Sequence, residues 1–122
     1  MDETGKKGED AACRWLAAKG HQILERNWRG GHCELDIISR DGDGLHFVEV
    51  KSRKAPTTAD PEVNVTPAKQ RHLVQAAKKY LHSGRDFAGE TEVFFDVITV
   101  ILKEDDTTYI NYYPQAFIPI YV

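Results

Sequence analysis

The sequence predicts an α/β domain in which helices flank a central mixed β-sheet, in the order helix, strand, strand, strand, helix, strand, strand. Two segments, 4–19 and 66–81, repeat their apolar residues every three or four positions, which is typical of amphipathic helices. The other segments contain β-branched, apolar runs that end in glycine, aspartate or proline, which indicates strands. There is no internal repeat, so we expect residues 1–122 to form one domain, with an exposed loop at 52–65 and an apolar C-terminal tail at 114–122.

The first helix is expected to end at Gly20, because glycine terminates helices without strain. Glu9 lies three residues before Ala12 and seven before Leu16, so it shares the apolar face of this helix. A carboxylate on a buried face needs a partner, since an unpaired buried charge is costly. We therefore expect Glu9 to face a functional site, or else to form a salt bridge or a cap at the helix start, where acids are common.

A strand at 21–28 leads into a hairpin, which has the most informative pattern in the sequence. The hairpin strands, 34–40 and 45–51, are joined by Asp-Gly-Asp-Gly, and the two glycines accept the positive φ that a tight turn needs. If Gly42 and Asp43 form the centre of the turn, the numbers of paired residues add to 85.

That register places Asp36 opposite Glu49 and Glu34 opposite Lys51, and alternation along the strands puts all four side chains on one face. Like charges that face each other across a sheet are destabilising. We therefore expect a cation between Asp36 and Glu49, most simply a divalent metal ion, with Lys51 beside it as a further positive charge. The alternative is an ordinary solvated face, but apolar residues such as Phe47 share the same alternation phase.

Thr66 and Pro67 are expected to begin the second helix, as its N-cap and its first turn. Lys69 lies four residues before Leu73 of the apolar face, so it is expected to point at the sheet, with Gln70 at the border of that face. The apolar face consists of Leu73, Ala76, Ala77, Tyr80 and Leu81.

Two further strands are expected at 92–102 and 108–113, the second at the sheet edge, with a charged turn between them. The tail that follows is apolar enough to dock on the domain itself or on a second copy of the chain, which would make a homodimer.

Charge is unevenly distributed along the chain. The net charge is −3, but residues 51–85 hold eight basic and two acidic side chains. A basic segment beside an acidic metal site suits a polyanionic substrate whose phosphate must approach the metal. For Lys78, Lys79 and Arg85 the alternative is an ordinary solvated helix face.

Several other kinds of site are excluded or disfavoured. No apolar run is long enough to span a bilayer and there is no secretory signal, so we expect a cytoplasmic location with Cys13 and Cys33 as free thiols. The Asp-Gly-Asp-Gly turn lacks the ligand spacing of a calcium loop. The cysteines and His32 have no zinc-site spacing, and the five histidines are scattered along the sequence.

Asp36 followed by Glu49-Val50-Lys51, with Glu9 on a preceding helix, resembles the PD-(D/E)xK nuclease superfamily, and is similar within it to the small archaeal Holliday-junction resolvases. The chain as a whole resembles the YraN-like family of bacterial proteins over nearly all of residues 4–101. The motifs that carry this resemblance are Gly8-Glu9-Asp10-Ala11-Ala12, Asn27-Trp28-Arg29, Glu34-Leu35-Asp36-Ile37-Ile38, Phe47-Val48-Glu49-Val50-Lys51-Ser52-Arg53 and Phe95-Asp96-Val97-Ile98.

The resemblance implies a restriction-endonuclease-like fold and a metal-dependent endonuclease acting on nucleic acid, DNA before RNA. In that case Asp36, Glu49 and the Val50 carbonyl would hold Mg²⁺ or Mn²⁺, hard cations that prefer oxygen ligands. Lys51 would orient a water or stabilise charge, and Glu9 would bind a second metal or position a water. The residues expected to contact flanking phosphates are Arg53, Lys54, Lys69, Gln70 and Arg71.

Two positions depart from the family pattern. Cys33 stands where the family usually has glycine, and Phe94 where it often has arginine. Without that arginine, we expect Asp96 to be a structural acid near the sheet rather than part of a salt bridge.

Three functions are therefore considered. The first is a structure-selective or general nuclease, and the second is a non-catalytic nucleic-acid-binding or adaptor protein that retains the fold. The third is an assembly partner that docks through the apolar tail. The intact set of Asp36, Glu49 and Lys51 favours the first.

Overall fold

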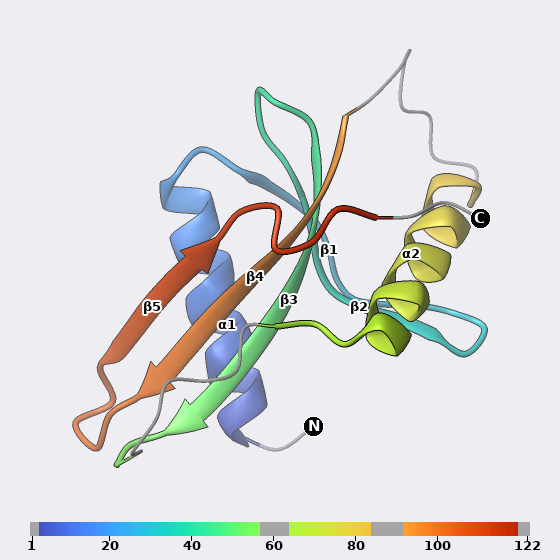
Figure 1. The fold of residues 1–122 in the computed structure, drawn as a ribbon. Coiled ribbons are helices and arrows are strands. Elements are labelled where there is room, and N and C mark those ends of the chain that lie inside the picture. Colours follow the sequence, from blue (N-terminus) through green and yellow to red (C-terminus); the bar gives the residue numbers. More distant parts are fainter. Residues whose placement is uncertain (1–2, 57–63, 84–91, 120–122) are drawn as a thin grey trace.

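The computed structural model describes residues 3–56, 64–83 and 92–119, and it confirms the predicted order of elements. In the described residues the strands form one five-stranded sheet, in which β3 and β4 are parallel and the other neighbours antiparallel (Figure 1). The sheet order is β1-β2-β3-β4-β5. The elements are α1 (Glu3–Ala18), β1 (Gln22–Gly30), β2 (Cys33–Arg40), β3 (Leu45–Lys54), α2 (Pro67–Leu81), β4 (Val93–Leu102) and β5 (Thr108–Tyr113).

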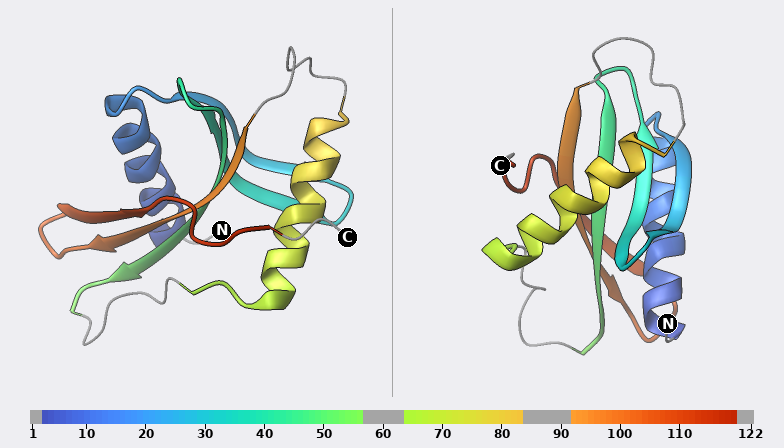
Figure 2. Two further views of the ribbon diagram at one scale, coloured as in Figure 1. Left: turned by 45° about the horizontal axis from the view of Figure 1, so that its top comes forward. Right: turned by 90° about the vertical axis from the view of Figure 1, so that its right-hand side faces the viewer.

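The two helices cover opposite faces of the sheet (Figure 2). Each buries an apolar stripe, and burial of such stripes supplies the main stabilisation of the fold. The core on the α1 side includes Ala12, Leu16, Ile37, Val48, Ile98 and Val100. The core on the α2 side includes Leu35, Ile38, Phe47, Leu73, Tyr80 and Phe95.

The expected start of the second helix is confirmed. The Thr66 hydroxyl accepts a hydrogen bond from the Lys69 N–H at 3.2 Å, and Pro67 occupies the first turn. The cap satisfies one of the N–H groups that have no partner within the helix.

The predicted hairpin register is confirmed where β2 pairs with β3. Ile37 pairs with Val48 and Arg40 with Leu45, so the numbers of paired residues add to 85. Counted from the turn, the last pair of this ladder is Ile37 with Val48, and Asp36 is the next residue of β2. Beyond it β3 runs on beside β4, and Lys51 pairs with Thr99 rather than with a residue of β2.

The prediction that side chains alternate strictly between the two sheet faces along β2 is wrong. Leu35 and Ile38 lie in the same core, on the α2 side, whereas Ile37 lies in the core on the α1 side. The break faces Asn27 of β1, which has a positive φ of 50°. Such a backbone conformation is uncommon for a residue other than glycine and bends the strand locally.

The predicted grouping of four charged side chains on one face is therefore also wrong. The Glu34 carboxylate lies 3.9 Å from Arg29 of β1 and is half exposed. It does not face Lys51, because the β2–β3 ladder has ended before either residue.

The structure moves the start of the predicted loop and shows where the apolar tail docks. The segment 52–54, expected in a loop, continues β3 because its backbone pairs with β4 through Ser52–Val100 and Lys54–Leu102. At the other end, Phe117 of the tail packs on Phe95 with ring centroids 5.0 Å apart, so the tail docks on its own domain as far as it is described. The last part of the tail, residues 120–122, and most of the predicted loop lie outside the described residues.

Neither helix of the described chain has the length and apolar character that crossing a bilayer requires.

Candidate functional site

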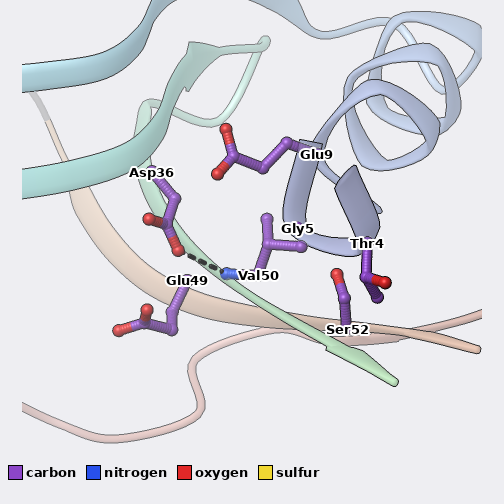
Figure 3. A pocket seen from close by; sticks show the side chains of 7 residues that line it. All are labelled: Thr4, Gly5, Glu9, Asp36, Glu49, Val50 and Ser52. Carbon is purple, nitrogen blue, oxygen red and sulfur yellow. Dashed lines mark hydrogen bonds between the residues drawn. The ribbon is translucent and has the colours of Figure 1, made fainter. Parts of the chain in front are cut away.

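A cavity of about 320 Å³ opens where β2 separates from β3, and the first half of α1 forms its opposite wall (Figure 3). The three acids singled out in the sequence, Glu9, Asp36 and Glu49, all line it. Thr4, Gly5, Val50 and Ser52 complete the lining. Helix α1 comes close to β3 because position 8 is glycine, where a Cβ atom would collide with the Ser52 side chain.

Asp36 lies at the point where the two strands part. Because Val50 has no β2 partner there, its backbone N–H donates to Asp36 Oδ2 at 2.9 Å. Burial, then the neighbouring Glu49 carboxylate, raises the pKa of Asp36 to about 7, although the Val50 N–H opposes the shift. Asp36 therefore carries a proton in a large fraction of molecules near neutral pH when no cation is bound.

Glu49 connects the cavity with helix α2. Its Oε2 atom is buried and accepts no hydrogen bond from the described residues, while Lys69 Nζ lies 3.5 Å away as an ion-pair partner. Lys69 thus points at the sheet, as its position on the helix predicted. Its ammonium group forms an ion pair with one of the three acids.

Glu9 enters the cavity from α1, as its helical phase predicted, and is 6% exposed. Burial, then the charge of Asp36, raises the pKa of Glu9, while a hydrogen bond with Asn27 opposes the shift. Its Oε1 atom is buried and finds no donor in the described part of the chain.

Three carboxylates of this cavity are therefore only partly satisfied. Glu9 Oε1 and Glu49 Oε2 are buried without a hydrogen-bond donor in the described residues, and Asp36 has a raised pKa beside Glu49. Buried polar atoms are ordinarily paired, so such a set suggests an absent cation. Carboxylate oxygens are the ligands that Mg²⁺ and Mn²⁺ prefer, and these residues fit that kind of ion.

Lys51 lies outside this group. Its Nζ atom donates to the Asn64 carbonyl at 3.3 Å, and it is not among the described residues that line the cavity. It follows Glu49 by two positions on β3, so the two side chains leave the strand on the same side.

The residues predicted to contact phosphates are spread over two elements. Arg53 and Lys54 are exposed at the end of β3, and Lys69 and Arg71 are exposed in the first turns of α2. Gln70 is half buried, and its side chain donates to the Val65 carbonyl at 2.8 Å.

The structure also brings together residues that the sequence analysis did not connect. The histidines were expected to be scattered, but His21 and His46 lie with ring centroids 4.6 Å apart, next to Asp41. Burial by itself lowers the pKa of His46, but hydrogen bonds to Asp96 and Asp41 outweigh burial and raise it. Burial, then the charge of His46, lowers the pKa of His21. The register that adds to 85 already places His46 near the turn that holds Asp41, and this signal was available in the sequence.

Asp96 is a buried acid of the sheet, as expected, and it forms an ion pair only when His46 is protonated. It is 2% exposed, and its Oδ2 atom lies 2.6 Å from His46 Nδ1. The partner is a histidine on the neighbouring strand, which the comparison with the family's arginine did not suggest.

Comparisons with known proteins identify the family. The family model described as "Uncharacterised protein family UPF0102" matches residues 8–100. The UPF0102 proteins of Syntrophomonas wolfei and Bacteroides thetaiotaomicron are 42% and 41% identical, over 94% and 97% of this chain and 97% and 94% of their own lengths. The relative in Oleidesulfovibrio alaskensis is 52% identical over 65% of this chain, and the match spans 39% of that longer protein. The matched residues contain Glu9, Asp36, Glu49 and Lys51. These matches confirm the resemblance to the YraN-like proteins, and the chain belongs to the UPF0102 family.

Proposed function

We propose that this protein is a metal-dependent endonuclease that hydrolyses phosphodiester bonds in nucleic acid, with DNA as its substrate. The observation that carries the proposal is the cavity in which Glu9, Asp36 and Glu49 converge from three elements with buried oxygens that lack donors. A purely structural acid cluster would be expected to recruit donors instead.

The residues have distinct roles in this proposal. Asp36 and Glu49, with the Val50 carbonyl, would hold Mg²⁺ or Mn²⁺, whose contribution when bound is Lewis acidity toward the scissile phosphate. Glu9 lies on the helix side of the cavity, where its carboxylate can accept a proton from a water molecule. Lys69, which pairs with Glu49 in the free protein, supplies positive charge for an entering phosphate.

A cytoplasmic location, where nucleic acid is accessible, belongs to the same proposal. Arg53, Lys54 and Arg71 are exposed and would contact phosphates away from the cleaved bond. Such contacts fix position without reading sequence.

The second candidate is a nucleic-acid-binding or adaptor protein that retains the fold without cleavage. The position of Lys51 favours it, because its ammonium group contacts the Asn64 carbonyl and does not line the cavity in the described chain. A lysine near the scissile phosphate is part of the nuclease pattern that this sequence resembles.

The two candidates are separated by cleavage assays. Wild-type protein is incubated with linear, flapped and four-way DNA in Mg²⁺ or Mn²⁺, beside Asp36→Asn, Glu49→Gln and Lys69→Ala. We expect cleavage by the wild type, with branched DNA cut fastest, and a loss of about 100-fold or more in each variant.

Glu34→Gln is the matched control, because Glu34 is an acid of the same strand whose side chain is half exposed. It should cleave like the wild type. If the wild type binds these DNAs but cuts none, the adaptor function replaces the proposal. Equal cleavage by Asp36→Asn would assign the activity to a contaminant and refute the site.

A further inference from the structure

A second cluster of ligand-type side chains lies at the other end of α1 from the acidic cavity. It consists of His21, which follows α1, Asp41, which begins the β2–β3 turn, and His46 of β3. One ligand atom from each of them lies within 4.8 Å of the others. Asp41 lies between the two rings, with Oδ1 2.9 Å from His46 Nε2 and Oδ2 3.4 Å from His21 Nε2.

The orientation of the two rings is fixed from behind. His46 Nδ1 donates to Asp96 Oδ2 at 2.6 Å, and His21 Nδ1 is hydrogen-bonded to Ser39 Oγ at 2.9 Å. With both Nδ1 atoms occupied, both Nε2 atoms are directed at Asp41. Histidines that bind metals in proteins are held in this manner, with the second ring nitrogen bonded to a carboxylate or another polar group.

These supporting groups are themselves buried and held. Ser39 is 0% and Asp96 2% exposed. Asp96 also accepts the Tyr112 hydroxyl at 2.6 Å and the Gln115 N–H at 2.9 Å, so its carboxylate cannot turn away from His46 without losing both. The histidine rings are thus preorganised by groups from β2, β4 and β5 and from the segment that follows β5.

An ion can reach the cluster and complete its coordination there. The cluster lines a cavity of about 320 Å³, which Asp43, Phe94, Tyr112 and Gln115 also line. The side chain of Asp41 is 21% exposed, against 6% for His21 and 7% for His46, so the open side is that of the carboxylate. The carbonyl end of α1, where the His21 N–H bonds to the Leu16 carbonyl, adds a partial negative charge that favours a cation.

From this geometry we propose that His21, Asp41 and His46 bind a divalent transition-metal ion, of which Zn²⁺ fits best. Two imidazole nitrogens and one carboxylate form a common zinc-binding set, with the fourth position left to water. Zinc ligands at about 2.0–2.2 Å from the metal stand roughly 3.3–3.6 Å apart in a tetrahedron. Different oxygens of Asp41 make its two contacts, at 2.9 and 3.4 Å, and the set with one ligand atom from each residue lies within 4.8 Å.

This site is distinct from the acidic cavity and does not depend on the nuclease proposal. His46 and Glu49 are three residues apart on β3, which is roughly 10 Å at about 3.3 Å per residue. The ligand chemistry also differs, because nitrogen ligands select zinc-like ions whereas an all-oxygen set selects Mg²⁺. A bound zinc ion would tie the end of α1 to the β2–β3 turn and, through Asp96, to β4.

The test is Zn²⁺ titration of the purified 122-residue chain by calorimetry, with metal content measured after dialysis. We expect one Zn²⁺ per chain, with a dissociation constant of micromolar or below, and binding that excess Mg²⁺ does not displace. His21→Gln and His46→Gln should each weaken binding at least tenfold. His32→Gln, which changes an exposed histidine of the β1–β2 turn, should bind like the wild type.

Two further variants keep the result interpretable. Asp41→Asn alters the more exposed ligand and should also lose zinc. It serves as the test if the histidine variants fail to fold. Asp96→Asn should weaken binding about 10- to 100-fold and shift the visible absorption of the Co²⁺-substituted protein, because it changes how His46 is held. The proposal is overturned if the wild type binds no stoichiometric zinc, or if zinc is lost only when Cys13 and Cys33 are replaced.

Discussion

Asp36 lies beside Glu49 and has a pKa raised to about 7, so it carries a proton in a large fraction of molecules near neutral pH when no cation is bound. Asp36 is buried, and its carboxylate accepts a hydrogen bond from the Val50 N–H. This N–H is available because the β2–β3 ladder ends before Val50. The arrangement costs stability whenever both groups are charged. The pH dependence of the free energy of unfolding measures this cost.

We expect the metal-free protein to lose stability between pH 5 and pH 8. The folded-state pKa of Asp36, about 7, lies above its ordinary value of 3.8, so the folded state binds more protons than the unfolded state between these values. The free energy of unfolding therefore falls as pH rises through this range. Relative to Asp36→Asn, which cannot titrate, the wild type should lose on the order of 1–3 kcal/mol.

Urea denaturation in EDTA at pH 5, 6, 7 and 8 measures this difference. Glu34→Gln, which removes an acid that lies near Arg29 at the surface, should retain the pH dependence of the wild type. A parallel pH profile for Asp36→Asn and the wild type would contradict the raised pKa of Asp36.

Mg²⁺ should stabilise the wild type, because an ion that binds only the folded state shifts the unfolding equilibrium by mass action. At a concentration 100 times the dissociation constant, the gain is about 2.7 kcal/mol. Asp36→Asn and Glu49→Gln should abolish the gain, and Glu9→Gln should reduce it. Thermal unfolding with and without Mg²⁺ gives the comparison, and an equal shift in all four proteins would show that Mg²⁺ binds elsewhere.

At the scale of elements, the cavity exists because α1 approaches β3 closely while β2 turns away from it. The close approach depends on Gly8, which packs against Ser52. The separation of β2 depends on the end of its ladder at Ile37 and on the positive φ of Asn27. The close approach of α1 and the separation of β2 both occur beside the acids, and both depend on residues other than the acids.

We expect Gly8→Ala to destabilise the protein. Alanine would gain up to about 1 kcal/mol of helix propensity over glycine. Its Cβ would collide with the Ser52 side chain, and overpacking of this kind costs about 1–3 kcal/mol. The clash should outweigh the propensity gain.

Gly42→Ala is the control, since a Cβ atom there meets nothing within 4 Å. Urea denaturation of both variants measures the difference. A Gly8→Ala protein as stable as the wild type would mean that the helix can move away from β3 at no cost.

At the scale of the whole molecule, charge is segregated in a way that the net value of −3 conceals. Basic residues of segment 51–85 lie at the end of β3 and on α2. Lys69 of α2 forms an ion pair with Glu49 of the cavity. The two sites on the α1 face, one of oxygen ligands and one containing nitrogen, lie toward opposite ends of that helix.

Binding to DNA should be electrostatic and largely independent of sequence. The logarithm of affinity should fall linearly with the logarithm of salt concentration, because bound phosphates release counterions. Replacing Arg53 and Lys54 with alanine should weaken binding and reduce the slope by about 2, at roughly 0.9 per phosphate contact.

Fluorescence anisotropy at several salt concentrations measures both quantities. Lys103→Ala, an exposed lysine of the β4–β5 turn, should leave the slope unchanged. Binding that does not respond to salt would place the contact surface elsewhere.

Several features of this protein are determined by interactions between residues that are close together in the sequence. The position of the turn set the hairpin register, helical phase placed Glu9 and Lys69 toward the sheet, and Thr66 with Pro67 marked the start of α2. Each of these features depends on residues a few positions apart, and such interactions are specified locally.

What only the tertiary structure decided depends on contacts between distant segments. Pairing with β4 extended β3 through Lys54, and the bend opposite Asn27 broke the alternation at Asp36. His46 and Asp96 are 50 positions apart and meet because β3 and β4 are parallel neighbours. Periodicity assigns a side chain to a face of its own element, but which side chain it meets depends on how the elements pack, and packing is a property of the whole chain.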